Sequence, residues 1–147
     1  TFDDAAIGNQ TITYRHSDGS FAAELANART FCQLRDVELM KNAGLALGGS
    51  LDNAVVVDDG KILNDGGLRM EREFVRHKAL DCLGDLLLLG LPVKAKMTAH
   101  RPGHALSTKL VQTLLNDPSA FKIVEAGTTQ GRSDSYVLPE LAAAATA

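Results

Sequence analysis

One long amphipathic segment, residues 74–89, most constrains how this chain can fold. At 100° per residue its apolar side chains cover one broad face of a helix, whereas His77, Asp81 and Asp85 follow one another along the opposite side. Polar groups at the edge of a buried helix need partners, because an unpaired polar group is costly away from water. The segment therefore predicts a central helix whose polar line is bound to something.

The spacing of His77 and Asp81 leaves two interpretations open. An imidazole at position i and a carboxylate at i+4 lie on neighbouring helical turns, close enough to bind one small cation from the same side. The same spacing also allows a plain histidine–aspartate hydrogen bond at the helix edge. A catalytic zinc normally takes three protein ligands, so a metal site would need a third ligand from elsewhere. Asp85, one turn further on, is equally ambiguous.

The composition indicates a soluble domain. The chain has 147 residues, is 45% hydrophobic and carries a net charge of −3 without a cluster of Lys or Arg, so we expect no nucleic-acid partner. Its longest apolar run, residues 86–89, is too short for a transmembrane segment. Cys32 and Cys82 fit reduced thiols in a cytoplasmic protein. Because the chain starts at Thr1, we expect a piece of something longer.

The order of the predicted elements favours an α+β fold with helices packed on one face of a mixed sheet. Ser20 and Asp36 read as helix N-caps, Gly44 and Gly90 as helix ends, and residues 58–60 as a turn. We expect this domain to occupy residues 1–126, with a mobile tail at 127–147. The expected strands or extended pieces are 10–15, 29–32, 45–50, 51–57, 61–63, 93–99 and 121–125, and the expected helices are 21–27, 37–42, 71–89 and 105–115.

Several of these stretches resemble the C-terminal half of the zinc-dependent UDP-3-O-acyl-N-acetylglucosamine deacetylases, enzymes of lipid A biosynthesis in Gram-negative bacteria. The resemblance runs from Ala28 to about Asn116. It implies that this chain is the second domain of a two-domain α/β sandwich and carries a small strand–helix insert. The matching stretches are ARTF at 28–31, LGGS at 47–50, VVVD at 55–58, LN at 63–64, FVRHK at 74–78 with Asp81 and GD at 84–85, and GHAL at 103–106 with KL at 109–110.

The resemblance implies Zn²⁺ as the cofactor, with His77 and Asp81 as metal ligands. The implied substrate is a UDP-linked acyl-glucosamine whose acetamide is hydrolysed. Zinc would polarise the amide carbonyl and lower the pKa of its bound water, so that attack proceeds near neutral pH.

The resemblance also implies four further catalytic residues. Thr30 and a charged His104 would stabilise the oxyanion or protonate the leaving amine. Asp85 would orient His104, and Lys78 would neutralise the nucleotide phosphates or the reaction centre.

Substrate contacts follow from the same resemblance. Phe31 would contact the sugar, and the insert would build a hydrophobic passage for the acyl chain. Without the resemblance, these positions read as ordinary packing residues. The implied passage residues are Val37, Met40, Gly49, Ser50, Leu51, Ala54 and Val56.

Two parts of the family's apparatus have no match in this sequence, namely the third zinc ligand, a histidine, and the glutamate general base. Both belong to the N-terminal half of the enzyme, which is therefore an expected partner, and we expect this chain to be inactive alone. His16 and His100 read as surface residues. The alternatives are a non-catalytic module that binds nucleotide-linked acyl-sugar or a partner domain, and a plain domain whose polar helix face docks against a lost partner.

Overall fold

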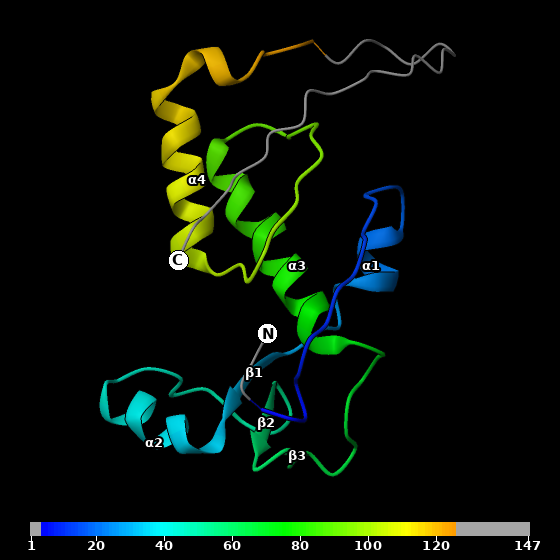
Figure 1. Cartoon of the computed structure of the whole chain (residues 1–147), viewed down its shortest axis with the longest axis vertical. Coiled ribbons are helices and arrows are strands. Elements are labelled where there is room, and N and C mark those ends of the chain that lie inside the picture. The colour runs from blue at the N-terminus through cyan, green and yellow to red at the C-terminus, as the bar shows by residue number, and fades with distance from the viewer. Residues whose placement is uncertain (1–3, 126–147) are drawn as a thin grey trace. The chain divides into compact units, whose positions relative to one another are not determined.

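The computed structural model describes residues 4–125 (Figure 1), and the chain forms two compact units. Unit 1 ends at Asp81 and unit 2 begins at Cys82, so the division falls inside the long helix α3 (Glu73–Leu86). The predicted domain end at residue 126 and the predicted tail lie outside the described residues. Unit 1 also holds α1 (Ser20–Glu24), β1 (Thr30–Gln33), α2 (Leu34–Asn42), β2 (Ala54–Asp58) and β3 (Lys61–Ile62), and unit 2 holds η1 (Leu87–Leu89), α4 (His104–Asn116) and η2 (Pro118–Ala120).

The three strands of unit 1 form a mixed sheet in the order β1-β2-β3. β1 pairs with β2 in parallel, with Phe31 opposite Val55, and β2 pairs with β3 antiparallel, with Val57 opposite Ile62. Asp59 and Gly60 make the predicted turn between β2 and β3 with φ of 46° and 73°, a conformation that suits Gly and Asp. The predicted α+β class with a mixed sheet is therefore confirmed.

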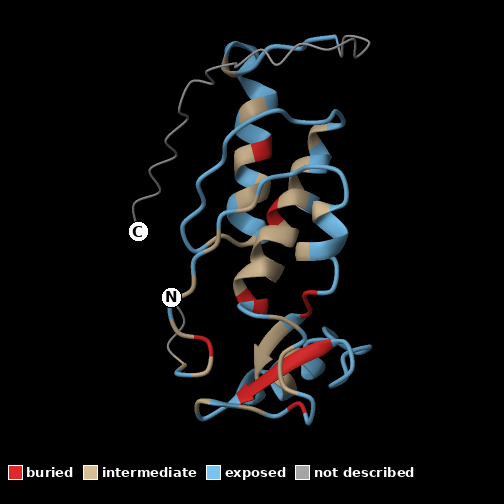
Figure 2. Ribbon diagram, turned by 90° about the vertical axis from the view of Figure 1, so that its right-hand side faces the viewer, coloured by how far each residue is buried: buried red, intermediate tan, exposed pale blue. Residues whose placement is uncertain are grey.

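β2 is the buried centre of unit 1 and appears red over most of its length in Figure 2. Val55 and Val57 are 0% exposed and form the core with Ile7 and Phe74. Side chains alternate along a strand, so Ala54 and Val56 point to the opposite face. The central helix thus contributes its N-terminal Phe74 to the same core as the sheet.

Helix α2 begins at Leu34, earlier than the predicted start at residue 37, because β1 passes directly into it. Asp36 lies in the first turn and is not the N-cap, which is Gln33, so that prediction was wrong. The predicted end is confirmed. Gly44 has φ 72° and donates to the Lys41 carbonyl, while the next N–H bonds back to Met40, which is a Schellman motif.

Helix α1 is shorter than predicted, and its N-cap is Gly19 with φ 77°. Ser20 is the first helical residue. Its hydroxyl accepts from the Ser17 N–H and donates to the Ser17 carbonyl, both at 2.8 Å, so it stabilises the preceding turn and does not cap the helix.

Gly90 ends the central helical segment as predicted, with φ 78°. The last turn tightens into the 3₁₀ helix η1, whose period is three residues per turn. Leu87, the first residue of η1, is 73% exposed, although the apolar pattern places it on the buried face. In unit 2, α4 lies against η1, begins at His104, one residue before the predicted start, and buries Val111.

Three predicted strands, at residues 10–15, 93–99 and 121–125, are wrong, and residues 46–48 of the extended piece predicted at 45–50 form a bend and a turn. Segment 10–15 is held by side chains, because Gln10 Oε1 accepts from the Val75 N–H and Arg72 donates to the Thr11 carbonyl. Segments 93–99 and 121–125 are exposed throughout. Across residues 4–125, every helix is too short or too polar to cross a bilayer.

Candidate functional site

Helix α3 carries His77 and Asp81 one turn apart, with side chains only 15% and 11% exposed. Nδ1 of His77 lies 3.2 Å from the Ala28 carbonyl oxygen. A carbonyl only accepts, so a hydrogen bond at this contact needs the proton on Nδ1, and a neutral ring with that proton has its lone pair on Nε2. Nε2 in turn lies 3.2 Å from Oδ1 of Asp81. Two electron-rich atoms that converge in this way, with the imidazole oriented by a backbone carbonyl, fit a shared divalent cation.

Lys78 lies beside this pair. Its Nζ is 3.5 Å from Oδ2 of Asp81 and 5.6 Å from the centre of the Phe31 ring. One carboxylate oxygen of Asp81 therefore meets His77 and the other meets the ammonium. Charge and the ring face together hold Lys78 over the start of β1.

Strand β1 begins at Thr30 and brings Phe31 next to the same turn of α3. The Phe31 ring packs edge-on against Phe74 at 5.0 Å and against His77 at 6.3 Å, measured between ring centres. Part of the ring is thus used in packing, and the residue is half-buried. Thr30, the first residue of the strand, is exposed.

Sequence reasoning missed the buried pair of Arg29 and Glu73, whose side chains are 7% and 0% exposed. Glu73 accepts from Nε of Arg29 at 2.9 Å, from Nη2 at 3.1 Å and from the Arg29 N–H at 2.9 Å. Burial opposes ionisation of Glu73, but these hydrogen bonds and one from the Arg69 N–H outweigh it and hold the pKa of Glu73 below its ordinary value. The sequence signal was an acidic residue in the first helical turn, which is typical of helix N-termini generally.

Unit 2 holds the second histidine–carboxylate pair. Nδ1 of His104 lies 3.0 Å from both oxygens of Asp85. Asp85 is 13% exposed and His104 is 69% exposed, so the carboxylate holds one edge of the ring while Nε2 stays accessible. This geometry suits a proton donor oriented by a carboxylate.

The predicted site residues are thus divided between the units. Thr30, Phe31, Lys78, His77 and Asp81 gather in unit 1, and Asp85 with His104 in unit 2. A surface shared by both groups remains a prediction. Within residues 4–125 no three side chains of His, Cys, Asp or Glu come together as a metal cage, and His77 with Asp81 is a pair of such side chains.

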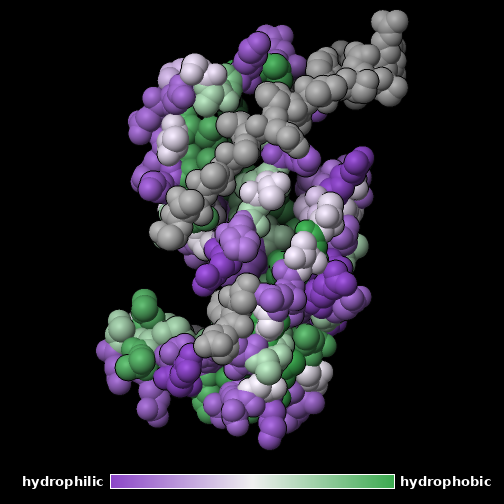
Figure 3. Space-filling model, in the orientation of Figure 1, coloured by the Kyte–Doolittle hydropathy of each residue, from purple (hydrophilic) through white to green (hydrophobic). Residues whose placement is uncertain are grey.

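The predicted acyl-passage residues lie on α2, on β2 and on the loop between them. Ala54 and Val56 are 8% exposed, whereas Gly49, Ser50 and Leu51 are exposed. Figure 3 shows hydrophobic residues gathered over α2 and the loop that follows it. The large apolar side chains exposed on this segment are Leu34, Leu39, Leu45, Leu47 and Leu51. Val37 and Met40, on α2, are half-buried.

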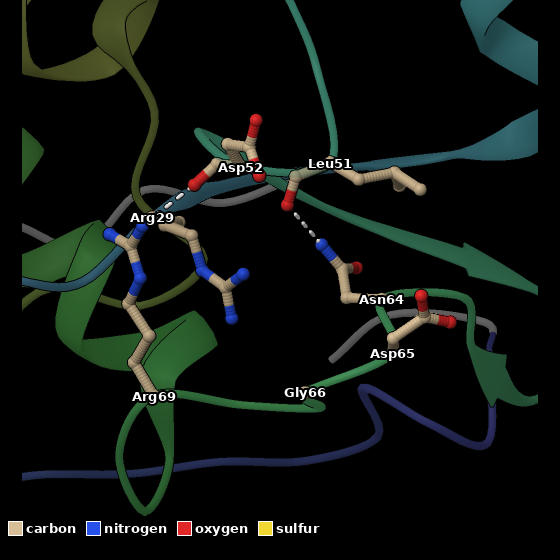
Figure 4. Close-up of a pocket in the computed structure, with 7 residues that line it drawn as sticks. All are labelled: Arg29, Leu51, Asp52, Asn64, Asp65, Gly66 and Arg69. Atoms are coloured by element: carbon tan, nitrogen blue, oxygen red, sulfur yellow. Dashed lines mark hydrogen bonds between the residues drawn. The ribbon is translucent and has the colours of Figure 1, made fainter.

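A separate cavity of about 270 Å³ opens near the start of β2 and is drawn in Figure 4. In it, Asn64 Nδ2 donates to the Leu51 carbonyl at 2.7 Å and Arg69 donates to the Asp52 carbonyl at 2.6 Å. Its lining includes neither His77 nor Asp81. This cavity is therefore distinct from the candidate site, and the side chains of Asn64 and Arg69 in it bind the protein's own backbone.

Cys32 is not a candidate nucleophile. Burial, followed by the charge of Asp36, raises the pKa of the Cys32 thiol above its ordinary value. The reactive form of cysteine is the thiolate, so this thiol is inert near neutral pH.

The described part of the chain is thus an α+β fold with two histidine–carboxylate pairs, a combination of side chains that acid–base and metal sites use. The chain is a member of the UDP-3-O-acyl N-acetylglycosamine deacetylase family (LpxC), whose family model matches residues 1–116.

Curated relatives support this membership. The chain is 52% identical over 123 residues to the UDP-3-O-acyl-N-acetylglucosamine deacetylase of Anaeromyxobacter sp. (strain Fw109-5), and the match covers 84% of this chain and 40% of that protein. It is 52% identical over 125 residues to the protein of the same name from Myxococcus xanthus (strain DK1622), a match that covers 85% of this chain and again 40% of the relative. The match to the protein of the same name from a Nitratiruptor species is 47% over 137 residues, which is 93% of this chain and 45% of the relative. The chain therefore spans less than half of these relatives.

Proposed function

We propose that this chain supplies the C-terminal half of the active site of a zinc-dependent UDP-3-O-acyl-N-acetylglucosamine deacetylase. The observation that carries the proposal is the convergence of Nε2 of His77 and Oδ1 of Asp81 at 3.2 Å, with the imidazole oriented by a backbone carbonyl. Family membership and the names of the relatives give the reaction class.

His77 and Asp81 would hold the zinc, and the third ligand and the general base would come from the N-terminal half. When bound, the metal would supply Lewis acidity toward the acetamide carbonyl and activate water for attack. Lys78 keeps Oδ2 of Asp81 engaged at 3.5 Å, which leaves Oδ1 directed at His77. The chain's own contribution is thus a pre-oriented pair of ligands.

His104 would act on the leaving group or the developing oxyanion. Asp85 contacts only Nδ1, so Nε2 is the atom that would hold or deliver a proton to the substrate. Thr30, exposed at the start of β1, would add a hydroxyl donor to the oxyanion. Lys78 would neutralise negative charge on the nucleotide or at the reaction centre.

The substrate's acyl chain would lie along the insert formed by α2, the loop after it and β2. Exposed leucines on this segment give the apolar surface that such a chain needs. Gly49 suits the close approach of the chain there, because a Cβ would lie 3.1 Å from the Ala46 carbonyl oxygen, which is tighter than most real Cβ contacts. In the complete enzyme this chain would be the second domain of a two-domain α/β sandwich. A cytoplasmic location stays a prediction.

Reconstitution tests the proposal. The full 147-residue chain is mixed with the N-terminal half of the Myxococcus xanthus relative, and zinc-dependent release of acetate from the UDP-linked substrate is measured. Neither polypeptide alone should turn over, because each lacks part of the metal site, and general-base catalysis alone contributes about 10²–10⁴-fold.

Two controls sharpen this result. His77→Ala in the mixture should abolish turnover, and His100→Ala should leave it unchanged, since His100 lies in an exposed loop. Turnover by the chain alone would contradict the half-site proposal. Substrate binding without turnover in a mixture that forms a stable complex would favour the non-catalytic module.

A further inference from the structure

A single peptide unit connects the chain before β1 to two residues of helix α3. The Ala28–Arg29 peptide presents its carbonyl oxygen to Nδ1 of His77 at 3.2 Å and its N–H to Oε1 of Glu73 at 2.9 Å. Glu73 and His77 are four residues apart, so one turn of the helix holds this peptide at both ends. The orientation of the carbonyl that His77 contacts is thereby fixed.

Glu73 is itself immobilised. Its carboxylate also accepts from Nε and Nη2 of Arg29 and, at 2.7 Å, from the Arg69 N–H, and its side chain is 0% exposed. Nη2 of Arg29 donates to the Gly67 carbonyl as well, at 2.8 Å. A charged acceptor that is satisfied from four sides cannot turn away from the peptide N–H without leaving buried donors unpaired.

The imidazole of His77 has two acceptors and, when neutral, one proton. The Ala28 carbonyl lies at Nδ1, and Oδ1 of Asp81 lies 3.2 Å from Nε2. A proton on Nδ1 leaves Nε2 able to bind a metal, whereas a proton on Nε2 would bond to Asp81 and block that nitrogen. How firmly the carbonyl is held therefore decides which tautomer forms.

We propose that Glu73 is a positioning residue for His77, which acts through the Ala28–Arg29 peptide to keep the imidazole proton on Nδ1 and the Nε2 lone pair directed at Asp81. This inference rests on the proposed function for the role of His77 as a metal ligand. The inference gives buried Glu73, which is 44 residues from its partner Arg29, a role in orienting a proposed metal ligand.

Nuclear magnetic resonance on the wild-type chain gives the first test. The full 147-residue chain, labelled with ¹⁵N and ¹³C and free of zinc, is measured at about pH 8, above the ordinary histidine pKa. We expect scalar couplings across two hydrogen bonds, from His77 Nδ1 to the Ala28 carbonyl carbon and from the Arg29 nitrogen to the Glu73 carboxyl carbon. We also expect ¹⁵N shifts of a major Nδ1–H tautomer. A folded chain with a major Nε2–H tautomer would overturn the inference.

The second test compares Glu73→Gln with Glu71→Gln. Glu71 is two residues away, its side chain is 82% exposed, and its ion pair is with Arg72 on the surface, so the control makes the same chemical change without touching the peptide. Glu73→Gln should raise the Nε2–H population of His77 and weaken zinc binding by the chain on the order of tenfold. Glu71→Gln should change neither.

Folding is controlled separately. If Glu73→Gln does not fold, the double variant Arg29→Met with Glu73→Leu replaces the buried ion pair by apolar side chains, which proteins often tolerate. This variant should show the same shift in tautomer. An unchanged His77 tautomer in either folded variant overturns the inference.

The outcomes separate the inference from the proposed function. If the wild-type chain binds zinc through His77 but Glu73→Gln alters neither tautomer nor affinity, the positioning role is wrong and the metal role stands. If the tautomer responds to Glu73→Gln but zinc never binds at His77, even with the N-terminal half present, the proposed function is wrong while the peptide link stands.

Discussion

Oδ1 of Asn64 accepts a hydrogen bond of 3.0 Å from the N–H of Val56 and thereby ties the loop after β3 to the middle of β2. Nδ2 of the same side chain donates to the carbonyls of Leu51 and Ala54 at 2.7 and 2.8 Å. Asn64 is 7% exposed. Its three hydrogen bonds therefore fix the start of β2 and the loop that carries Leu51, a predicted contact of the acyl chain.

Asn64→Ala should lower the free energy of unfolding by about 2–3 kcal/mol, because it leaves one backbone N–H and two carbonyls without their partner in a buried place. Urea unfolding followed by circular dichroism measures the change. Asn53→Ala is the matched control. Asn53 also bonds two backbone groups, of Ser50 and Gly48, but it is exposed, so water replaces its bonds. Equal losses in the two variants would contradict the structural role of Asn64.

The free energy of unfolding should fall at acid pH, because protonation of Glu73 breaks its ion pair with Arg29. Burial disfavours its charge, but the hydrogen bonds from Arg29 and Arg69 prevail and hold the pKa of Glu73 below its ordinary value of 4.5. Because the pKa of Glu73 is lower in the folded state than in the unfolded state, the ion pair makes its full contribution to the free energy of unfolding above pH 4.5. This contribution is lost as the pH falls through the pKa of Glu73 in the folded state.

Denaturant unfolding between about pH 6 and pH 3 checks this dependence. The wild-type free energy of unfolding should fall in the acid part of the range, and Glu73→Gln should be less stable at about pH 6 with a flatter profile. Glu71→Gln should keep the wild-type slope, since Glu71 lies at the surface. A profile for Glu73→Gln that is as steep as the wild-type profile would assign the acid sensitivity to other carboxylates.

Local signals in the sequence predicted that the helices exist and where α2 and the central segment end, but both predicted N-caps were wrong. The apolar period at 74–89 gave α3, Gly90 gave its end, and Asp59 with Gly60 gave the turn after β2. These features depend on residues within one or two turns of each other. The pairing of His104 with Asp85 also followed from the sequence, but only through the resemblance to a family.

Contacts between distant segments could not be predicted. The alternation at 10–15 and 93–99 is typical of strands, yet a strand needs a partner, and pairing is not visible in one segment. Arg29 meets Glu73 across 44 residues. The group that orients His77 is the backbone carbonyl of Ala28, which every residue possesses and no sequence pattern marks.

The chain alone should bind zinc weakly, because a site with two protein ligands lacks the added affinity that a third ligand gives a complete site. His77→Ala should lower the zinc affinity by at least about tenfold in calorimetric titration. Removing a ligand should weaken binding no less than removing a residue that orients the ligand. His16→Ala and His100→Ala are the controls. Affinity typical of a three-ligand site, or a loss of binding in either control, would mean that a further histidine coordinates the metal.

Asp85 and His104 should behave as one unit in the reconstituted enzyme. His104→Ala should lower kcat by about 10²–10³ with a smaller effect on KM, because a contact to the oxyanion forms mainly in the transition state. Asp85→Ala should lower kcat less, since the ring keeps its place at the start of α4 but loses the carboxylate at Nδ1. Steady-state kinetics of the double variant decides the coupling: its loss should be close to that of His104→Ala alone, because Asp85 acts only through the ring. Losses that multiply would show that Asp85 contributes independently of His104, and the orienting role would have to be given up.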